Sequence, residues 1–126
     1  MTHERRALGA AGETAACDYL VRHGYRILER NARAGGVELD IVAERRGVLV
    51  FVEVKTRRSA RHGGGEEAVD ARKQARIVRG ASAWLHDRRP RTRRLRFDVV
   101  TCEPGPQDTF HVSHWPGAFD AGGWNG

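Results

Sequence analysis

Two acidic residues and a lysine are spaced so that they could act together on a phosphodiester. Asp40 is followed, after twelve intervening residues, by Glu53, and Lys55 lies two positions further on. The runs 38–43 and 48–55 are rich in β-branched and apolar residues, and the short segment between them ends in glycine, a pattern typical of a β-hairpin. We therefore expect two paired strands that carry these polar side chains.

The length of the hairpin turn decides whether the polar groups meet. A two-residue or a four-residue turn places Asp40 opposite Glu53 and Glu38 opposite Lys55, with Cβ atoms about 5 Å apart. Residues two apart in a strand share a face. The four polar groups then converge, and the opposite face receives Leu39, Ile41, Val52 and Val54. A three-residue turn would shift the register and separate the polar groups.

The chemistry predicted for this arrangement is metal-dependent hydrolysis. Two close carboxylates repel each other, and a bound divalent cation removes the repulsion. Carboxylate oxygens suit Mg²⁺ or Mn²⁺, which keep several waters and accept the phosphate oxygens of a substrate. Lys55 could orient or deprotonate the attacking water, or stabilise charge developing on the phosphate.

The same residues also permit a simpler interpretation, an exposed cross-strand ion pair worth a few tenths of a kcal/mol. Apolar residues on both faces of the hairpin favour the catalytic interpretation, because a buried charge without a partner is costly. Lysine usage favours it too. Among 22 basic residues only Lys55 and Lys73 are lysines, and lysine, unlike arginine, can lose its proton. The alternative is that these two lysines are present by chance in an arginine-rich chain.

Composition indicates one small domain with a polyanionic partner. The chain has 126 residues, 40% of them hydrophobic, and a formal charge of +6, with an isoelectric point near 10.3. A polyanion such as nucleic acid is therefore the expected partner. The basic surplus concentrates in residues 88–96, a run suited to phosphate contacts, although such runs are equally often only solubilising.

Other features exclude several classes. No apolar run approaches the ~20 residues of a membrane span, and the first residues lead into an amphipathic helix, so we expect a cytoplasmic protein without membrane contact. Cys17 and Cys102 match no metal pattern and are expected as buried, reduced thiols. His111 and His114 are three apart in an expected strand and face opposite sides, which argues against a shared zinc.

The remaining elements are expected from periodicity and from residues that begin or end helices. A first helix spans 7–23, and a second begins after the N-cap Asp70 and ends at Pro90. Strands are expected over 25–30, 95–102 and 110–113, with a turn over 31–36 and a Gly-rich loop over 57–67 that could close on substrate. The chain from Pro116 is unassigned. This order predicts an α/β fold with a central mixed sheet flanked by helices.

The chain resembles the restriction-endonuclease-like, PD-(D/E)XK nuclease superfamily, and more closely the YraN-like family of small bacterial proteins. The resemblance covers residues 1–119 as one domain and leaves 120–126 as a Gly-rich tail. It rests on Gly12-Glu13, residues 24–31, 38–42 and 50–57, Ala68-Val69, Lys73-Gln74 and residues 96–100. Val37 stands where the family usually has glycine before the first acid.

The resemblance implies roles for individual residues. Asp40 and Glu53 correspond to the metal ligands and Lys55 to the catalytic lysine, with Glu13 as a further ligand and Gln74 as an accessory helix residue. Nucleic-acid contacts are expected from Lys73, Arg57 and Arg76, with an active-site role as the alternative for Lys73. Asp98 is expected in a strand-end ion pair with an arginine.

Three functional classes follow. The first is a Mg²⁺- or Mn²⁺-dependent deoxyribonuclease acting on structured or branched DNA in repair or recombination. The second is a nucleic-acid-binding protein of the same fold without hydrolysis. The third is a structural partner of other DNA-processing proteins. It would need an exposed apolar patch, for which the aromatic residues Trp115, Phe119 and Trp124 are the only candidates, and these could equally pack on the core. A resolvase would need a dimer with two sites, and the sequence leaves monomer and homodimer open.

Overall fold

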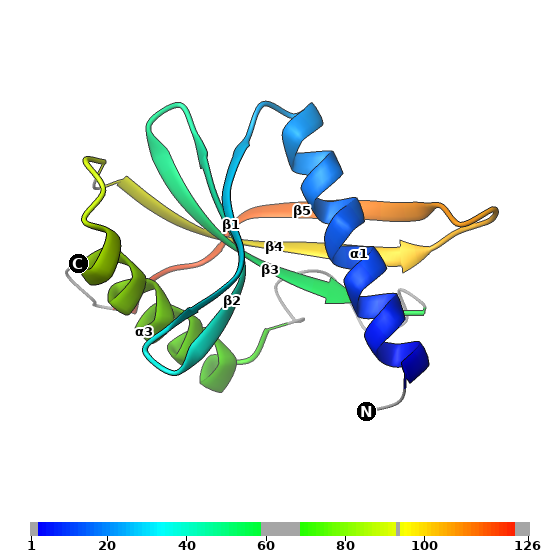
Figure 1. Cartoon of the computed structure of the whole chain (residues 1–126), viewed down its shortest axis with the longest axis horizontal. Helices are drawn as coiled ribbons and strands as arrows, with labels where there is room; N and C mark the ends of the chain where they lie inside the picture. The colour runs from blue at the N-terminus through cyan, green and yellow to red at the C-terminus, as the bar shows by residue number, and fades with distance from the viewer. Residues whose placement is uncertain (1–2, 59–68, 93, 123–126) are drawn as a thin grey trace.

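The structure is a computed structural model that describes residues 3–58, 69–92 and 94–122 (Figure 1). The expected loop over 57–67 therefore lies almost wholly outside the described residues. The elements in chain order are α1 (His3–Arg22), β1 (Arg26–Ala34), β2 (Val37–Arg45), β3 (Val48–Thr56), α3 (Ala71–Arg88), β4 (Arg94–Pro104) and β5 (Phe110–Phe119).

The five strands form one mixed sheet in the order β1-β2-β3-β4-β5. Neighbouring strands are antiparallel except β3 and β4, which are parallel. A parallel pair needs a crossover, and α3 supplies it between β3 and β4. The helices α1 and α3 lie on opposite sides of the sheet (Figure 1). The predicted fold class, an α/β fold with a mixed sheet flanked by helices, is confirmed.

The β2–β3 hairpin has the expected two-residue turn. Arg46 and Gly47 both adopt positive φ, 50° and 76°, the backbone twist that suits a tight hairpin between twisted strands. Pairing runs from Arg45 opposite Val48 to Ile41 opposite Val52. This is the register predicted from the sequence, and it fixes which residues of the two strands meet.

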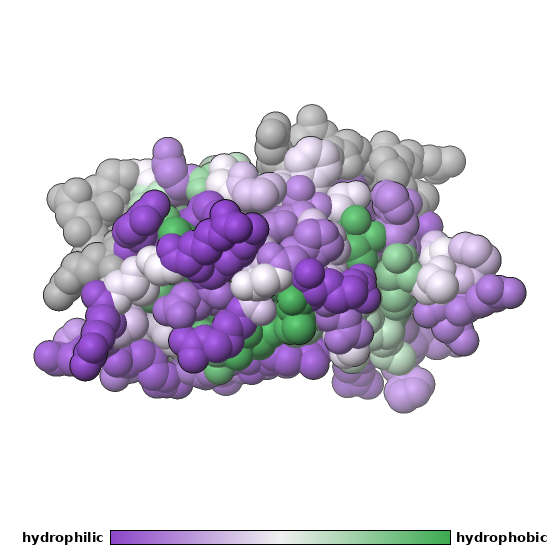
Figure 2. Space-filling model, turned by 90° about the horizontal axis from the view of Figure 1, so that it is seen from above, coloured by the Kyte–Doolittle hydropathy of each residue, from purple (hydrophilic) through white to green (hydrophobic). Residues whose placement is uncertain are grey.

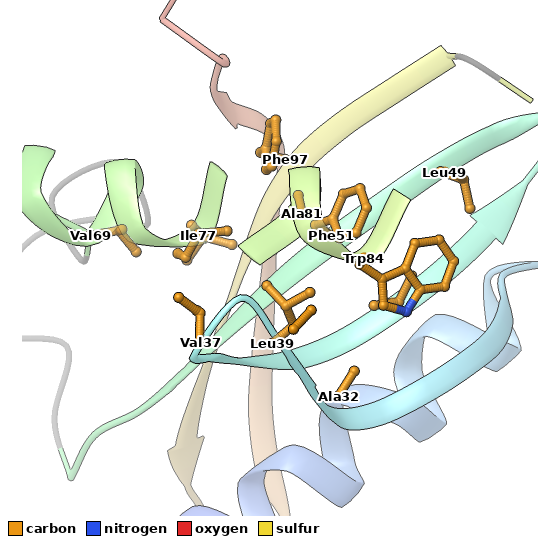
Figure 3. Packing of buried hydrophobic residues seen from close by; sticks show 13 residues of the cluster. Ala32, Val37, Leu39, Leu49, Phe51, Val69, Ile77, Ala81, Trp84 and Phe97 are labelled. Atoms are coloured by element: carbon orange, nitrogen blue, oxygen red, sulfur yellow. The ribbon is translucent and has the colours of Figure 1, made fainter. Parts of the chain in front are cut away.

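The sheet is covered by an apolar layer on each face. The α3 layer joins that helix to the sheet, and Figure 3 shows side chains of α3 pointing at those of β2 and β3. Its members include Ala32, Leu39, Phe51, Ile77, Ala81, Trp84 and Phe97. The α1 layer contains Ala16, Leu20, Tyr25, Ile41, Val50, Val52 and Val100. Burial of these side chains, at about 25 cal/mol per Å² of apolar area, is the main force holding both helices.

Two expectations for the strands are wrong. The turn expected over 31–36 is confined to Gly35 and Gly36, both at positive φ, and β1 runs on to Ala34. Asn31, at φ 52°, is a left-handed position inside the strand, so a residue typical of turns marks a local irregularity instead. The last strand also continues past residue 113 to Phe119, with Gly117 at φ 62° in a register shift opposite β4.

The sequence leaves the C-terminal aromatic residues open between a docking surface and packing on the core, and the described ones pack on the core. Trp115 and Phe119 pack against the α3 layer, and Trp124 lies outside the residues that the structure describes. Val21, 57% exposed, is the one large hydrophobic residue recorded as exposed in the described chain. Hydrophilic side chains predominate on the face drawn in Figure 2.

Two further expectations concern the cysteines and membranes. Cys17 and Cys102 are free and buried, as predicted. Burial raises the pKa of the Cys102 thiol to about 11, which keeps it protonated and unreactive at neutral pH. No helix within the described ranges has the length and apolar character needed to cross a membrane.

Candidate active site in the fork between β2 and β3

Strands β2 and β3 separate at one end, and the candidate site lies in the resulting fork. Their pairing stops at Ile41 and Val52. Beyond that point β2 stays paired with β1 as far as Val37, while β3 stays paired with β4 as far as Thr56. The two inner strand edges therefore part, and their backbone groups must find other partners.

The Asp40 carboxylate fills this fork. Its Oδ2 accepts a 2.9 Å hydrogen bond from the backbone N–H of Val54. A side chain thus replaces the strand partner that β3 lacks at this point. The bond reaches across to β3 within the sheet, and it anchors the carboxylate between the two layers.

The chain changes face at Asp40. Leu39 packs in the α3 layer and Ile41 in the α1 layer, although residues two apart in a regular strand share a face. On β1, the left-handed Asn31 lies between pairs that hold Ala32 opposite Leu39 and Arg30 opposite Ile41. The expectation that Leu39 and Ile41 point to the same side is therefore wrong, because both strands are irregular here.

Glu53 brings a second carboxylate to the fork. It lies on β3 with only 7% of its surface exposed, within hydrogen-bonding reach of Asp40. Burial, and next the charge of Glu53, raise the pKa of Asp40 to about 8, against the opposing effect of the Val54 N–H. A buried acid and a half-buried acid that cannot both ionise at low cost form a site that favours an added positive charge.

A lysine from α3 contacts the acid pair formed by Asp40 and Glu53. The Nζ of Lys73 lies 2.9 Å from Oε1 of Glu53. The helix start fixes its position: Asp70 is the N-cap of α3, and its Oδ1 accepts from the N–H of Lys73. The sequence leaves Lys73 open between a phosphate contact and an active-site role, and this ion pair places its ammonium group at the acid pair. The rarity of lysine in this chain is the sequence signal for that position.

Glu13 approaches from the α1 side. The neighbouring Gly12 is buried, and a Cβ there would overlap the Thr56 side chain at the end of β3, so glycine is what lets α1 approach the fork. Burial, opposed by Arg30, raises the pKa of Glu13. Arg30 Nη2 lies 3.8 Å from Glu13 Oε1, and this buried oxygen makes no hydrogen bond with the described residues.

The predicted convergence of all four hairpin groups is wrong in part. Glu38 lies half-exposed beside β1, with its Oε2 3.5 Å from Nη1 of Arg33. Lys55 is exposed, and its ammonium group forms no ion pair or hydrogen bond with another described residue. The cause is the fork itself, since regular pairing would have to continue beyond Ile41 and Val52 to hold Glu38 against Lys55.

The fork offers the carboxylates of Asp40 and Glu53 to a cation, and the third carboxylate, that of Glu13, lies further away. Within residues 3–58, 69–92 and 94–122, no group of three or more His, Cys, Asp and Glu side chains is arranged to hold a metal ion. Mg²⁺ characteristically uses one or two carboxylates plus water and phosphate oxygens. The pair Asp40 and Glu53, with the raised pKa of Asp40, fits that requirement. Glu13 as a ligand stays a prediction.

The other expected site residues are dispersed. The Nε2 of Gln74 donates to the Val69 carbonyl at 2.9 Å, which supports the start of α3. Arg57 is half-buried, and its N–H donates to the Cys102 carbonyl, extending the β3–β4 pairing. Arg76 is exposed on α3. The nucleic-acid contacts of Arg57 and Arg76 and the accessory role of Gln74 stay predictions.

Asp98 belongs to a separate structural network. It is fully buried inside β4 rather than at a strand end, and it accepts two 2.8 Å hydrogen bonds from Arg96. His114 Nε2 lies 2.7 Å away, and the Gly117 N–H donates at 3.0 Å. Burial alone would raise the pKa of Asp98, but these partners together hold it below its usual range. The expected ion pair is confirmed, and it secures the irregularity in β5.

The fold and the site together define an α/β domain with a pair of carboxylates at a fork in a mixed sheet. The chain belongs to the family described as "Uncharacterised protein family UPF0102", whose model matches residues 12–102. A "UPF0102 protein" of Syntrophotalea carbinolica is 48% identical over 98% of this chain and 100% of its own length. One of Trichlorobacter lovleyi is 49% identical over 91% of each chain.

One solved structure shows a distant likeness. It is titled "The structure of Pyrococcus Furiosus SfsA in complex with Ca2+". The two proteins are 17% identical, with a TM-score of 0.35, and the match covers 89% of this chain and 63% of that one.

Proposed function

We propose that this protein is an endonuclease that hydrolyses phosphodiester bonds of DNA with Mg²⁺ or Mn²⁺. The observation that carries the proposal is the pairing of Asp40 and Glu53 in the fork, where burial and mutual repulsion raise the pKa of Asp40 to about 8. Such a pair is costly to keep unless it binds a cation. The sequence resemblance to the PD-(D/E)XK nucleases adds support.

Each residue of the site would have its own role in hydrolysis. Asp40 and Glu53 bind the cation, and the backbone N–H of Val54 holds Asp40 in position. The cation, when bound, acts as a Lewis acid and lowers the pKa of water. The ammonium group of Lys55, which is exposed on the strand that carries Glu53, contacts the attacking water or the phosphate. Lys73 neutralises Glu53 from α3.

The substrate class follows from charge. The formal charge of +6 favours association with a polyanion through release of counterions. Structured or branched DNA is the substrate that the resemblance suggests. Its processing in repair or recombination belongs to the same proposal.

The test is cleavage of labelled single-stranded, duplex, flap and four-way-junction DNA with Mg²⁺ or Mn²⁺. The wild type is compared with Asp40→Asn and Lys55→Met. Asp18→Asn, the same chemical change at an exposed position of α1, serves as the control. Metal-dependent cutting that survives in Asp18→Asn and is lost in the other two supports the proposal. Cutting retained by Asp40→Asn would reject it.

A second candidate, nucleic-acid binding without hydrolysis, is favoured by one contact. The Nζ of Lys73, 2.9 Å from Glu53, already supplies positive charge to the acid pair. If that ammonium is the permanent counterion, the wild type and Asp40→Asn will bind the same DNA equally and neither will cut it. Binding measured beside cleavage separates the two candidates.

A further inference from the structure

Two arginines adopt an unusual backbone conformation at the end of the sheet remote from the fork. Arg46, in the β2–β3 turn, has φ 50°, and Arg89, the C-cap of α3, has φ 46°. Such left-handed positions favour glycine or asparagine. A side chain there brings its Cβ too close to the following carbonyl oxygen. The fold alone would be served better by glycine at both sites.

The two segments that carry these arginines lie side by side. Thr92 Oγ1 donates a hydrogen bond to the carbonyl of Gly47, and Arg94 lies opposite Val48 where the β3–β4 ladder begins. Figure 1 shows the β2–β3 turn and the α3–β4 connection at the same end of the molecule. Segments 45 residues apart in sequence therefore form one surface. We call it the arginine patch and define it as Arg46, Arg89, Arg91 and Arg94, all of them exposed.

The charge of the patch is uncompensated by the described residues. Other arginines near this end are paired: Arg26 lies 2.8 Å from Glu44, and Arg88 lies 2.8 Å from Glu29. Arg96, from the same basic run, is committed to Asp98. In contrast, no carboxylate of the described chain lies within ion-pair distance of an arginine of the patch. Four cations gathered without acids are suited to a polyanion.

We propose that the arginine patch is a second contact for the phosphate backbone of nucleic acid, separate from the fork. The inference rests on the proposed substrate class. Along β3, the five residue-to-residue steps from Val48 to Glu53 span about 17 Å, which corresponds to about five base pairs of a duplex at ~3.4 Å each. The patch therefore holds the flanking arm of a duplex whose other part lies at the fork.

The test removes the charge without harming the fold. Arg46→Gly combined with Arg89→Gly places glycine where φ is positive, so the double variant is expected to be at least as stable as the wild type. Binding of a labelled DNA duplex is measured in EDTA over a range of KCl concentrations. The control, Arg6→Gln with Arg22→Gln, removes the same charge from exposed positions of α1.

We expect the glycine variant to bind about tenfold more weakly and its slope of log affinity against log salt to fall by about two, one unit for each lost phosphate contact. The control should change both quantities much less. Equal losses in the two double variants would overturn the inference, as would a wild type that binds acidic phospholipid vesicles through the patch but not the duplex.

Binding in EDTA is independent of hydrolysis, so the two proposals can fail separately. Patch-dependent binding by a wild type that never cuts DNA rejects the nuclease and retains the arginine patch. Metal-dependent cutting by the wild type, with DNA affinity unchanged in the Arg46→Gly and Arg89→Gly double variant, supports the nuclease and rejects the arginine patch.

Discussion

The Asp40 carboxylate accepts a hydrogen bond from the backbone N–H of Val54 across the gap between two strands that no longer pair. One residue therefore both completes the sheet and supplies half of an acid pair. The two roles conflict, because the first is served by a neutral acceptor and the second requires a charge in a half-buried place. Substitutions and changes of pH separate these two roles.

Asp40→Asn should stabilise the fold at pH 8 and abolish any hydrolysis. The folded-state pKa of Asp40 is about 8, above its ordinary value of about 4, so the stability linked to this group is present at low pH and is lost as pH rises through 8. Asparagine keeps an acceptor for Val54 without the charge. We expect a gain of at least about 1 kcal/mol in the free energy of unfolding at pH 8.

Urea unfolding at pH 5 and pH 8 checks this expectation. The wild type should lose stability between the two values, and Asp40→Asn should lose less. Asp18→Asn is the control, because its side chain is exposed. A wild type with the same stability dependence on pH as Asp40→Asn would contradict the raised pKa.

Divalent cations should stabilise the wild type in a pH-dependent way. A cation between Asp40 and Glu53 binds the ionised carboxylates, so binding releases a proton and strengthens as pH rises towards 8. The melting temperature with Mn²⁺ should therefore increase more at pH 8 than at pH 5, by several degrees at saturating metal. An equal increase in Asp40→Asn would show that the metal binds elsewhere.

Lys73→Met should destabilise the protein by about 1 kcal/mol, because it leaves the buried Glu53 without its ammonium partner. Half of the lysine side chain is exposed, which limits the effect. Lys73→Arg keeps the charge and is the control. Mn²⁺ should then raise the melting temperature of Lys73→Met more than that of the wild type; a smaller rise would mean that Lys73 assists metal binding rather than substitutes for it.

Gly12→Ala should cost about 2 kcal/mol, because its methyl group would overlap Thr56 and force α1 away from β3. Gly9→Ala lies in the same helix with no atom within 4 Å of the added Cβ, and it should stabilise by up to about 1 kcal/mol. Thr56→Ala in the Gly12→Ala background should recover part of the loss. Thermal unfolding of the three variants beside the wild type measures all of these effects. If both glycine replacements destabilise the protein equally, the cause lies within the helix itself and not in the contact between α1 and β3.

Asp98→Asn should cost about 3 kcal/mol at neutral pH, because Arg96 loses a buried partner with two hydrogen bonds. The pKa of Asp98 is held below its usual range, so its stabilising effect is present above about pH 4 and is lost as pH falls further. Denaturant unfolding at pH 7 and pH 3 should show the difference from wild type shrinking. A Mn²⁺ response unchanged from that of the wild type would confirm that this network is separate from the fork.

The fold was predictable where local rules decide it. The two-residue turn at Arg46 and Gly47 determines the register from Ile41 to Arg45, and the spacing of apolar residues identifies both helices. The end of β1 was not predictable in this way. Asn31 resembles a turn residue, yet it occupies a single left-handed position within a continuing strand, and only pairing with β2 distinguishes the two cases.

The sequence predicts which residue types form the site better than it predicts how those residues are arranged in space. Asp40 and Glu53 are placed by the hairpin, a local structure. The contact between Lys73 and Glu53 joins a helix start to a strand twenty residues earlier, and it depends on how α3 packs on the sheet. Lys55 and Glu38 fail to meet because β2 follows β1 while β3 follows β4, a competition that the hairpin sequence alone does not reveal.

The bond between Val54 and Asp40 also gives the protein an internal spectroscopic probe. Most backbone amides in a sheet donate to carbonyl groups, whose charge never changes, but this one donates to a carboxylate. The nuclear magnetic resonance signal of the Val54 amide proton should therefore move when Asp40 gains or loses its proton, and move again when a cation takes up the charge. A single resonance would report the state of the fork without substrate, label or mutation.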